Sequence, residues 1–256
     1  MTDIFRDYAK IYDIIYKDKD YLGECDFLVK IFKKYAKEPV RDVLDVACGT
    51  GNHAMILAKK GFNMYAQDMS ADMLGLARKK AKSKNLKIKF MPARPMQSFS
   101  HKRKFDAVIA MFSSIDYVIG HNDFKSTLKN IRACLKNTGI FTFDFWNKSY
   151  VLKHYSPSRK RIFADGDKKV VRISKTNLDR GNSVAKIEYT CHYFDNGRKL
   201  HSINESHRMK FYGISEIKKI LNECGFETLA CFPFLKSGKN NCSGDWNISI
   251  VASPKN

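Results

Sequence analysis

The chain has 256 residues, 44% of them hydrophobic, which suffices for one globular core or for a core with an insertion. No stretch approaches the roughly 18 unbroken apolar residues of a membrane span, and the N-terminal residues lack the basic-then-apolar layout of a secretion signal. The seven cysteines are scattered and form no C-x-x-C pair. This pattern indicates reduced thiols, so the sequence predicts a cytoplasmic protein without a disulfide framework or a zinc site.

The formal net charge is +20, and lysine and arginine cluster in several segments. A basic surface concentrates anionic partners such as RNA, DNA or phosphate-bearing small molecules, but the same clusters are typical of solvated helix faces. Aromatic residues do not alternate with the basic clusters as a single-strand binding platform requires. Charge alone therefore leaves the partner open.

The first half of the chain alternates between expected helices and strands. A tyrosine-rich opening covers residues 1–21, and a helix is predicted over 20–37, ended by Pro39. Further helices are expected over 52–60, over 70–82 with Ser70 as N-cap, and from Asn122 or Asp123 to about 135, followed by a turn at 137–139. Strands are expected over 43–47, 63–67, 88–91, 105–111 and 140–145. This alternation predicts a parallel sheet covered by helices on both faces.

The alternation ends after Trp146. Residues 158–212 lack helical periodicity and contain turn signals at 165–166, 180–181 and 196–197, which indicates a small antiparallel β insertion. A helix capped by Ser215 and stopped by Gly225 follows, and then two strands over 226–234 and 246–252. The sequence thus predicts a Rossmann-like domain of residues 1–146 and 213–256, interrupted by an insertion of residues 147–212. Its terminal strands are expected to add an antiparallel hairpin to a mostly parallel, seven-stranded sheet.

A glycine-rich loop marks the expected ligand site. Gly49 and Gly51 lie where the first strand leads into a helix, so the backbone can approach a ligand closely beside free N–H groups. Asp68 ends the second strand, where an acid can accept hydrogen bonds from both ribose hydroxyls of an adenosine. The same glycines also satisfy the dinucleotide pattern of NAD enzymes. Asp45 favours a different ligand, because its carboxylate would repel a pyrophosphate but attract a cationic amino acid group.

Four ordered segments carry a family resemblance: 43–51 (VLDVACGTG), 68–74 (DMSADML), 105–109 (FDAVI) and 135–144 (LKNTGIFTFD). They resemble successive motifs of class I S-adenosylmethionine-dependent methyltransferases. The pairs Tyr12-Asp13 and Asp20-Tyr21, the run Met111-Phe-Ser-Ser-Ile115 and the antiparallel insertion resemble the small-molecule branch. That branch contains the N,N-dimethyltransferases of nucleotide-linked aminosugars and, more distantly, glycine N-methyltransferases.

The resemblance implies S-adenosylmethionine as the cofactor and S-adenosylhomocysteine as the product. It places the methionine part of the cofactor on the glycine loop and the ribose on the acid after the second strand. Residues after the third and fourth strands complete the implied pocket. The cofactor-binding residues implied in this chain, together with Asp45, are Ala47, Gly49, Gly51, Asp68, Met69, Met96, Met111 and Phe112. One departure is Pro95, which stands where the family usually has an acid that accepts the adenine amino group.

Aromatic residues are the candidates for the acceptor side. Methyl transfer needs a nucleophile in line with the sulfonium–methyl bond in a site that excludes water, and aromatic faces can stabilise a sulfonium. Tyr12 is the leading candidate for covering the cofactor and contacting the acceptor, and Tyr21 is expected near the cofactor's amino acid end. Tyr117 and Trp146 follow the fourth and fifth strands, at the edge where parallel sheets bind ligands. Core packing is the alternative for this tyrosine-rich opening.

Other side chains are weaker candidates. Asp116 is a less favoured general base than Tyr117, and the histidines in or near the insertion (His154, His192, His201 and His207) are expected to pack or to face solvent. No Asn-Pro-Pro-Tyr or Pro-Cys motif follows the fourth strand, which argues against methylation of a flipped base or of cytosine C5. No ligand cluster for a catalytic metal is evident.

The favoured interpretation is methylation of a small-molecule amine, with an anionic acceptor such as a nucleotide-linked aminosugar in view, by a monomer or homodimer that does not enter a membrane. Three alternatives stay open at this stage. One keeps the reaction but takes RNA or protein as the acceptor, because of the basic surface. Another is a module that binds S-adenosylmethionine without catalysis, suggested by Pro95. The least favoured is a dehydrogenase.

Overall fold

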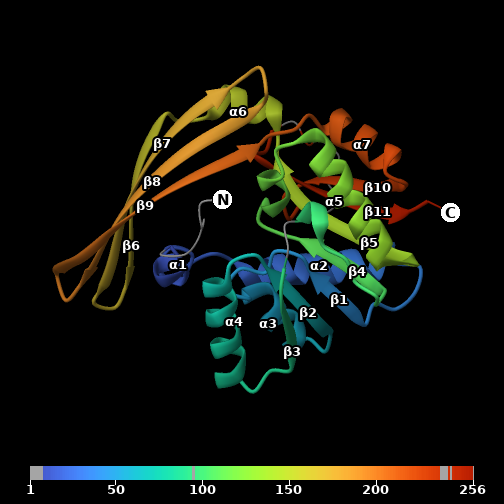
Figure 1. Ribbon diagram of the computed structural model, residues 1–256, viewed down its shortest axis with the longest axis horizontal. Helices are drawn as coiled ribbons and strands as arrows, with labels where there is room; N and C mark the ends of the chain where they lie inside the picture. The colour runs from blue at the N-terminus through green and yellow to red at the C-terminus, as the bar shows by residue number, and fades with distance from the viewer. Residues whose placement is uncertain (1–7, 94–95, 237–241, 243, 256) are drawn as a thin grey trace.

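Two β-sheets organise the molecule in the computed structural model, which describes residues 8–93, 96–236, 242 and 244–255. The larger sheet has seven strands in the order β10-β11-β5-β4-β1-β2-β3, and the smaller has four in the order β6-β7-β8-β9. In Figure 1 the smaller sheet extends away from the larger one, and α1 lies between them near the N-terminal end of the described chain. The expected Rossmann-like fold with an antiparallel addition is confirmed.

The larger sheet is parallel through its first five strands. These are β1 (Asp42–Asp45), β2 (Asn63–Asp68), β3 (Ile88–Pro92), β4 (Phe105–Ala110) and β5 (Leu135–Trp146). The central β4 is buried at every position, as strands covered on both faces must be. The last two strands, β10 (Phe226–Pro233) and β11 (Asn247–Pro254), pair antiparallel with each other, and β11 pairs antiparallel with β5. The predicted terminal hairpin is therefore present.

The helices that connect these strands are α2 (Tyr21–Tyr35), α3 (Asn52–Lys59), α4 (Ala71–Ser83), α5 (His121–Cys134) and α7 (Ile214–Glu223). Ser70 caps α4 as predicted, since its hydroxyl accepts from the Met73 N–H at 3.2 Å. The other two predicted N-caps are wrong, because α5 and α7 begin two or three residues earlier, after glycines whose backbone is extended. Gly120 caps α5 in place of Asn122 or Asp123, and Gly213 caps α7 in place of Ser215.

The turn predicted at residues 137–139 is also wrong, because β5 continues through it. The strand pairs Leu135 with Phe105 and Ile140 with Ala107, so the register shifts and the extra residues form a bulge. A Cβ on Gly139 would lie 2.8 Å from the Asp106 carbonyl oxygen. Glycine is needed here for close approach of two strands, although its sequence context resembles a turn.

The smaller sheet is an antiparallel meander of β6 (Ser158–Asp165), β7 (Lys168–Asp179), β8 (Val184–Asp195) and β9 (Arg198–Lys210). Its connections fall at the three turn signals read from the sequence. The helix α6 (Lys148–His154), which the sequence analysis does not anticipate, joins β5 to this sheet, and α1 (Ala9–Ile15) packs against β6 and β7. Buried Tyr8, Ile11 and Ile15 form a core cluster with Val170, Cys191 and Ile203 of the meander.

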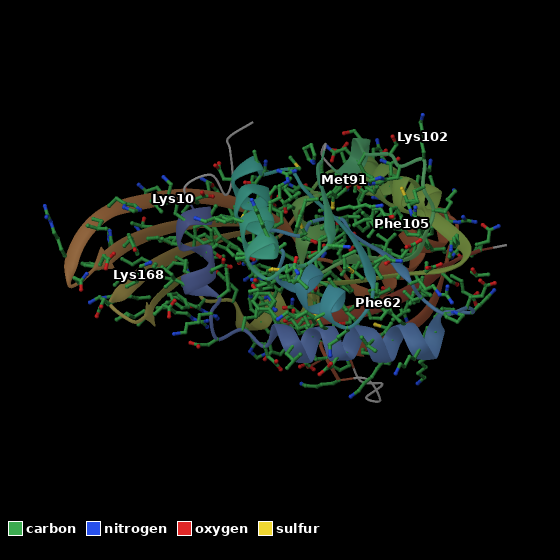
Figure 2. The ribbon with its side chains drawn as sticks, turned by 90° about the horizontal axis from the view of Figure 1, so that it is seen from below. Lys10, Phe62, Met91, Lys102, Phe105 and Lys168 are labelled. Carbon is green, nitrogen blue, oxygen red and sulfur yellow. The ribbon has the colours of Figure 1, made fainter. Side chains whose placement is uncertain are left out.

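The main cores lie on the two faces of the larger sheet, where side chains of β4 and β5 meet α5 and α7 on one face and α2 and α3 on the other. Figure 2 shows Phe62, Met91 and Phe105 around the larger sheet, with Lys10 and Lys168 at the end where the smaller sheet projects. Within the described ranges no helix is both long and apolar enough to cross a membrane. Two short 3₁₀ helices, η1 (Met96–Ser98) and η2 (Ser114–Tyr117), follow β3 and β4.

Candidate active site

A single cavity of about 1110 Å³ is lined by residues of both sheets. One end is formed by loops at the carboxyl ends of β1, β2 and β4, where ligands of open parallel sheets bind. The other end is formed by side chains of β6, β7, β8 and β9, and residues 8, 12 and 16, in and next to α1, line it as well.

The glycine loop is tied to Asp68 at the first end. The Gly49 N–H donates to Asp68 Oδ2 at 2.8 Å, and the Ser70 N–H donates to Asp68 Oδ1 at 2.9 Å. Burial raises the pKa of Asp68, although these backbone donors act in the opposite direction. Gly49 has φ +53°, and a Cβ there would meet nothing within 4 Å. The loop thus leaves open space beside a carboxylate with fixed orientation.

Gly51 has a structural role in helix packing. Its φ is +79°, which favours glycine, and a Cβ would lie 3.1 Å from the Ala77 Cβ. It is the residue before α3 and does not line the cavity. Gly51 therefore lets α3 begin close against α4, which sets the position of the loop indirectly.

Asp45 lies directly behind the loop. Its Oδ1 accepts from the Ala47 N–H at 3.3 Å, whereas its Oδ2 is buried and has no hydrogen-bond partner among the described residues. Burial raises the pKa of this carboxyl to about 6. Asp45 does not itself line the cavity, but Val46 and Ala47 next to it do. An acceptor atom left unsatisfied in this way fits a cationic ligand group.

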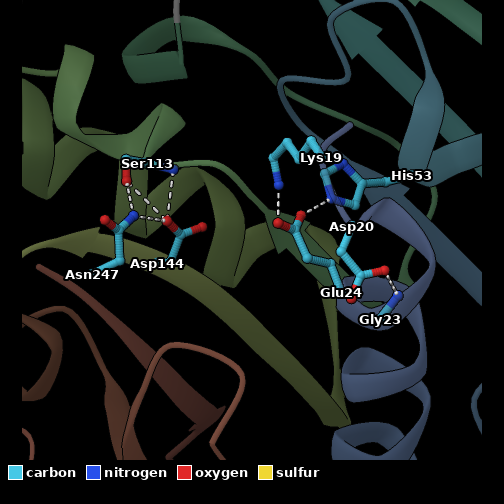
Figure 3. A network of polar contacts seen from close by, with 8 residues as sticks. All are labelled: Lys19, Asp20, Gly23, Glu24, His53, Ser113, Asp144 and Asn247. Atoms are coloured by element: carbon cyan, nitrogen blue, oxygen red, sulfur yellow. Dashed lines mark hydrogen bonds and ion pairs between the residues drawn. The ribbon is translucent and has the colours of Figure 1, made fainter. Parts of the chain in front are cut away.

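A buried chain of ionisable groups, shown in Figure 3, lies beside this end. The Lys19 ammonium pairs with the Glu24 carboxylate, which also contacts His53 Nε2 at 2.6 Å. Burial lowers the pKa of Lys19 to about 8 and that of His53 to about 4, so the imidazole is neutral at pH 7. The Lys19 Nζ lies 4.8 Å from the ring centroid of Tyr21 and 4.6 Å from that of Phe112. This group of buried charges therefore fixes the rings of Tyr21 and Phe112, both of which line the cavity.

The loop after β4 has a strained backbone held by a second buried carboxylate. Phe112 and Ser113 have φ of 62° and 54°, unusual for residues with side chains. The Asp144 Oδ2 accepts from the Ser113 N–H at 2.9 Å, from its hydroxyl at 2.8 Å and from Asn247 Nδ2 at 2.8 Å (Figure 3). These bonds hold the loop so that Phe112 faces the cavity.

Residues of the N-terminal segment cover the site. Asp13 links α1 to the glycine loop and to α4, because its carboxylate accepts from Thr50 Oγ1 at 2.7 Å and from Lys80 Nζ at 2.8 Å. Tyr12 is packed against Tyr16, with ring centroids 4.6 Å apart. The ion pair between Asp13 and Lys80 is not predicted from the sequence, although Tyr12-Asp13 is among the residues that carry the family resemblance.

The second end of the cavity contains a phenol–imidazole pair. The Tyr117 hydroxyl lies 2.7 Å from His207 Nδ1, and both residues line the cavity. Trp146 lines it as well and packs edge-on against Trp246 at 5.2 Å. Asp116 is fully buried behind them and accepts from the Trp146 N–H at 2.9 Å, and it does not line the cavity.

The strands of the smaller sheet add positive charge to this end. Four arginines line it: Arg159, Arg161, Arg172 and Arg208. Arg172 Nη1 donates to the hydroxyls of Tyr8 and Tyr16 at 2.9 and 3.2 Å. Among the described lining residues the carboxylates are Asp68, the last residue of β2, and Asp72, in the first turn of α4. The two ends of the cavity therefore differ in charge.

Apart from Asp45 and Gly51, every residue predicted to bind cofactor or acceptor lines this one cavity. They comprise Tyr12, Tyr21, Ala47, Gly49, Asp68, Met69, Met96, Met111, Phe112, Tyr117 and Trp146. Pro95 lies outside the described residues. Of the four histidines considered in the sequence, His207 lines the cavity, whereas His154, His192 and His201 do not. Nothing local in the sequence distinguishes His207 from the others.

Comparison with known proteins identifies the family of the chain. A methyltransferase domain family matches residues 43–139, from β1 to the bulge of β5. The chain is 30% identical over 230 residues to a protein of Geobacillus sp. (strain WCH70) named as a methyltransferase, covering 88% of this chain and 90% of the relative. It is 26% identical to the dTDP-3-amino-3,6-dideoxy-alpha-D-glucopyranose N,N-dimethyltransferase of Streptomyces fradiae, covering 88% of this chain and 85% of that protein.

Among solved structures, an S-adenosylmethionine-dependent methyltransferase from Clostridium acetobutylicum ATCC 824 matches with a TM-score of 0.83 and 25% identity. The match covers 98% of this chain and 99% of that one, so the smaller sheet is included. The resemblance read from the sequence motifs is thereby confirmed.

Proposed function

Because the chain belongs to the family of S-adenosylmethionine-dependent methyltransferases, we propose that it methylates an amine of a small, negatively charged acceptor. The proposed acceptor class is a nucleotide-linked aminosugar. The observation that carries this proposal is the charge difference between the two ends of one cavity, with carboxylates beside the glycine loop and arginines on the smaller sheet. The aminosugar N,N-dimethyltransferase of Streptomyces fradiae supports the choice of acceptor.

S-adenosylmethionine is the cofactor of this family, and it supplies an electrophilic methyl group on a sulfonium. The residues at the first end fit it. The Asp68 carboxylate would accept from the ribose hydroxyls, and the open side of Gly49 leaves room for close approach of the backbone. The unsatisfied Oδ2 of Asp45 would attract the ammonium of the amino acid group, and Met69 and Met96 would contact the adenine. The rings of Tyr21 and Phe112 would border the sulfonium end.

The acceptor side is assigned to the insertion, residues 147–212, together with the N-terminal segment. Tyr12 covers the cavity from α1, and Tyr117 and Trp146 would orient the amine from the larger sheet. Holding the amine in line with the methyl group in a site without water accounts for much of the rate enhancement. The arginines on β6 and β7 would bind the acceptor's phosphates, because a guanidinium forms bidentate hydrogen bonds with phosphate.

The other hypotheses are less well supported. An RNA or protein acceptor rests on net charge alone, and a binding module without catalysis rests on Pro95, outside the described residues. All seven cysteines are free thiols, which supports the proposal that the enzyme works in the cytoplasm.

The test is a transfer assay with S-adenosylmethionine labelled in its methyl group. We expect dTDP-3-amino-3,6-dideoxyglucose to acquire label on nitrogen, in a reaction that saturates with acceptor. Total RNA and a peptide mixture serve as competing acceptors. Label found in RNA, with binding that weakens steeply with salt, would replace the proposal by the nucleic acid hypothesis. Binding of S-adenosylhomocysteine without turnover of any of the three would favour the binding module.

A further inference from the structure

The side chain of His207 joins a hydroxyl of the acceptor end to a buried carboxylate. Its Nδ1 lies 2.7 Å from the Tyr117 hydroxyl, and its Nε2 lies 3.5 Å from Glu205 Oε2. The side chains of His207 and Glu205 are only 3% and 7% exposed. Tyr117 comes from η2 and the other two from β9, so the contact also joins the larger sheet to the smaller one.

Glu205 places a carboxylate on a buried face of β9. His207 and Glu205 are two residues apart on a strand, so both side chains project from the same face of the smaller sheet. Burying a carboxylate and an imidazole there costs free energy that an apolar pair would not cost. A structural contact between sheets does not need ionisable groups, which points to a chemical role.

The surroundings of His207 are aromatic. Its ring centroid lies 5.0 Å from that of Tyr189, 5.8 Å from that of Tyr117 and 6.0 Å from that of Tyr8. Among the residues that the structure describes, the titratable and charged groups that face it, directly or through these rings, include Tyr117, Glu205, Tyr189, Tyr8 and Arg172. Glu205 is the only acidic side chain among these described neighbours, and burial keeps the pKa of the Tyr117 phenol well above its usual range.

We propose that Tyr117, His207 and Glu205 form a proton relay, in which Tyr117 contacts the acceptor amine and His207 takes up the proton that methyl transfer releases. This inference rests on the proposed function, because it needs an amine at the acceptor end. The negative charge of Glu205, 3.5 Å from Nε2, favours a proton on that nitrogen, so that Nδ1 of His207 accepts from the Tyr117 hydroxyl. The phenol oxygen is then left with lone pairs to accept an N–H of the amine.

The step balances without a further reactant. The amine nitrogen forms a bond to the methyl carbon while the sulfur–methyl bond breaks, and that electron pair remains on the sulfur of S-adenosylhomocysteine. The new ammonium gives one proton to the Tyr117 oxygen, and Tyr117 gives its own proton to His207 Nδ1. The imidazolium is paired with the Glu205 carboxylate until solvent removes the proton. Tyr117 is the catalytic residue in this scheme, and His207 and Glu205 are positioning residues that act through it.

His207→Asn tests the relay most sharply, because its amide can accept a hydrogen bond near the Nδ1 position but cannot take up a proton. With dTDP-3-amino-3,6-dideoxyglucose as acceptor, we expect kcat to fall about 100-fold, in the range of general base catalysis. We expect KM and the affinity for S-adenosylhomocysteine to change less than twofold. The pH dependence of kcat is expected to differ between the wild type and this variant, because the variant has no imidazole to exchange a proton with Tyr117. His192→Asn is the matched control, since His192 bonds to Ser202 in the same sheet and does not line the cavity.

Wild-type kcat in His207→Asn would overturn the relay, and so would a lower kcat with an unchanged pH profile, which indicates a structural role. If this variant does not fold, Glu205→Gln replaces it. It removes the charge that stabilises the imidazolium, and we expect kcat to fall about 10-fold, at the low end of that range.

A second measurement does not depend on turnover. Nitrogen NMR of the protein saturated with S-adenosylhomocysteine reports which imidazole nitrogen carries the proton. We expect His207 to be protonated at Nε2, with an Nδ1 resonance that shifts in Tyr117→Phe. A proton on Nδ1 of the neutral ring would overturn the relay. If the expected tautomer is found but no acceptor is methylated, the proposed function has failed while the hydrogen-bond geometry of the relay stands.

Discussion

The two ends of the cavity are built by different means. At the cofactor end, short stretches of chain supply backbone N–H groups and carboxylates, as where Gly49 and Ser70 both donate to Asp68. At the acceptor end, side chains far apart in sequence meet, as where Tyr117 contacts His207, 90 residues away. In the proposed arrangement, local motifs hold the cofactor that the family shares, and side chains brought together by long-range packing select the acceptor. A substitution at one end should therefore leave binding at the other end unchanged.

The largest expected effect is at Asp68. In Asp68→Asn the side chain loses its charge, and we expect S-adenosylhomocysteine to bind about 100-fold more weakly, equivalent to about 2.7 kcal/mol for two charge-assisted hydrogen bonds. Isothermal titration calorimetry measures this directly. Asp72→Asn is the matched control, because Asp72, in the first turn of α4, lines the same cavity but is solvent exposed. Equal affinities of Asp68→Asn and wild type would contradict the assignment of this end to the cofactor.

The next effect is at the arginines of β6. Replacing Arg159 and Arg161 by alanine should raise KM for the dTDP-linked acceptor about 30-fold, through loss of two phosphate contacts of about 1 kcal/mol each. The affinity for S-adenosylhomocysteine should not change. Lys160→Ala is the control, since residue 160 projects from the opposite face of the strand and does not line the cavity. A matching rise of KM in the control would show that net charge matters and position does not.

The smallest effect concerns pH at the cofactor end. Burial raises the pKa of Asp45 to about 6, so the carboxyl is ionised above that pH and neutral below it. A cationic ligand group favours the ionised form, and affinity for S-adenosylhomocysteine is therefore expected to be full above pH 6 and to fall about tenfold by pH 5. Binding near pH 5.5 should release a proton, which calorimetry in buffers of different ionisation enthalpy detects.

The matched variants separate this effect from general acid sensitivity. Asp45→Asn should bind more weakly at pH 7 and lose the change between pH 5 and 7, whereas Asp42→Asn at the other end of β1 should keep it. In the free protein, ionisation of Asp45 has the opposite effect: it lowers the free energy of unfolding, whereas it strengthens binding of a cationic ligand. A folded-state pKa above the unfolded value of about 3.9 makes the Asp45 contribution favourable at low pH and unfavourable as pH rises through 6. Proton uptake on binding would contradict the assignment.

Sequence reasoning found what local patterns encode. The alternation of strands and helices predicts the larger sheet, and Gly49 and Asp68 are recognisable because a strand end, a glycine turn and an acid follow one another between residues 45 and 68. The turn signals at 165–166, 180–181 and 196–197 gave the meander for the same reason. The caps at Gly120 and Gly213 were missed because a glycine N-cap carries no side-chain signal.

The remaining features depend on tertiary contacts. The turn expected at 137–139 was wrong because the close approach of Gly139 to β4 is visible only once the strands are paired. Asp144 belongs to the motif at residues 135–144. Its hydrogen bond from the Ser113 N–H forms only when the fold brings β5 next to the loop after β4. His207 has the sequence context of an ordinary strand residue, since its partner Tyr117 lies 90 residues away in η2.

The central claim is that one cavity takes the cofactor at the carboxyl ends of β1 and β2 and the acceptor against the smaller sheet. A crystal structure of the protein with S-adenosylhomocysteine tests it most directly. We predict that both ribose hydroxyls lie within hydrogen-bond distance of the Asp68 carboxylate and that the sulfur faces the space bordered by Tyr12 and Tyr117. An adenosine bound among Arg159, Arg161 and Arg172, or outside the cavity, would contradict the account.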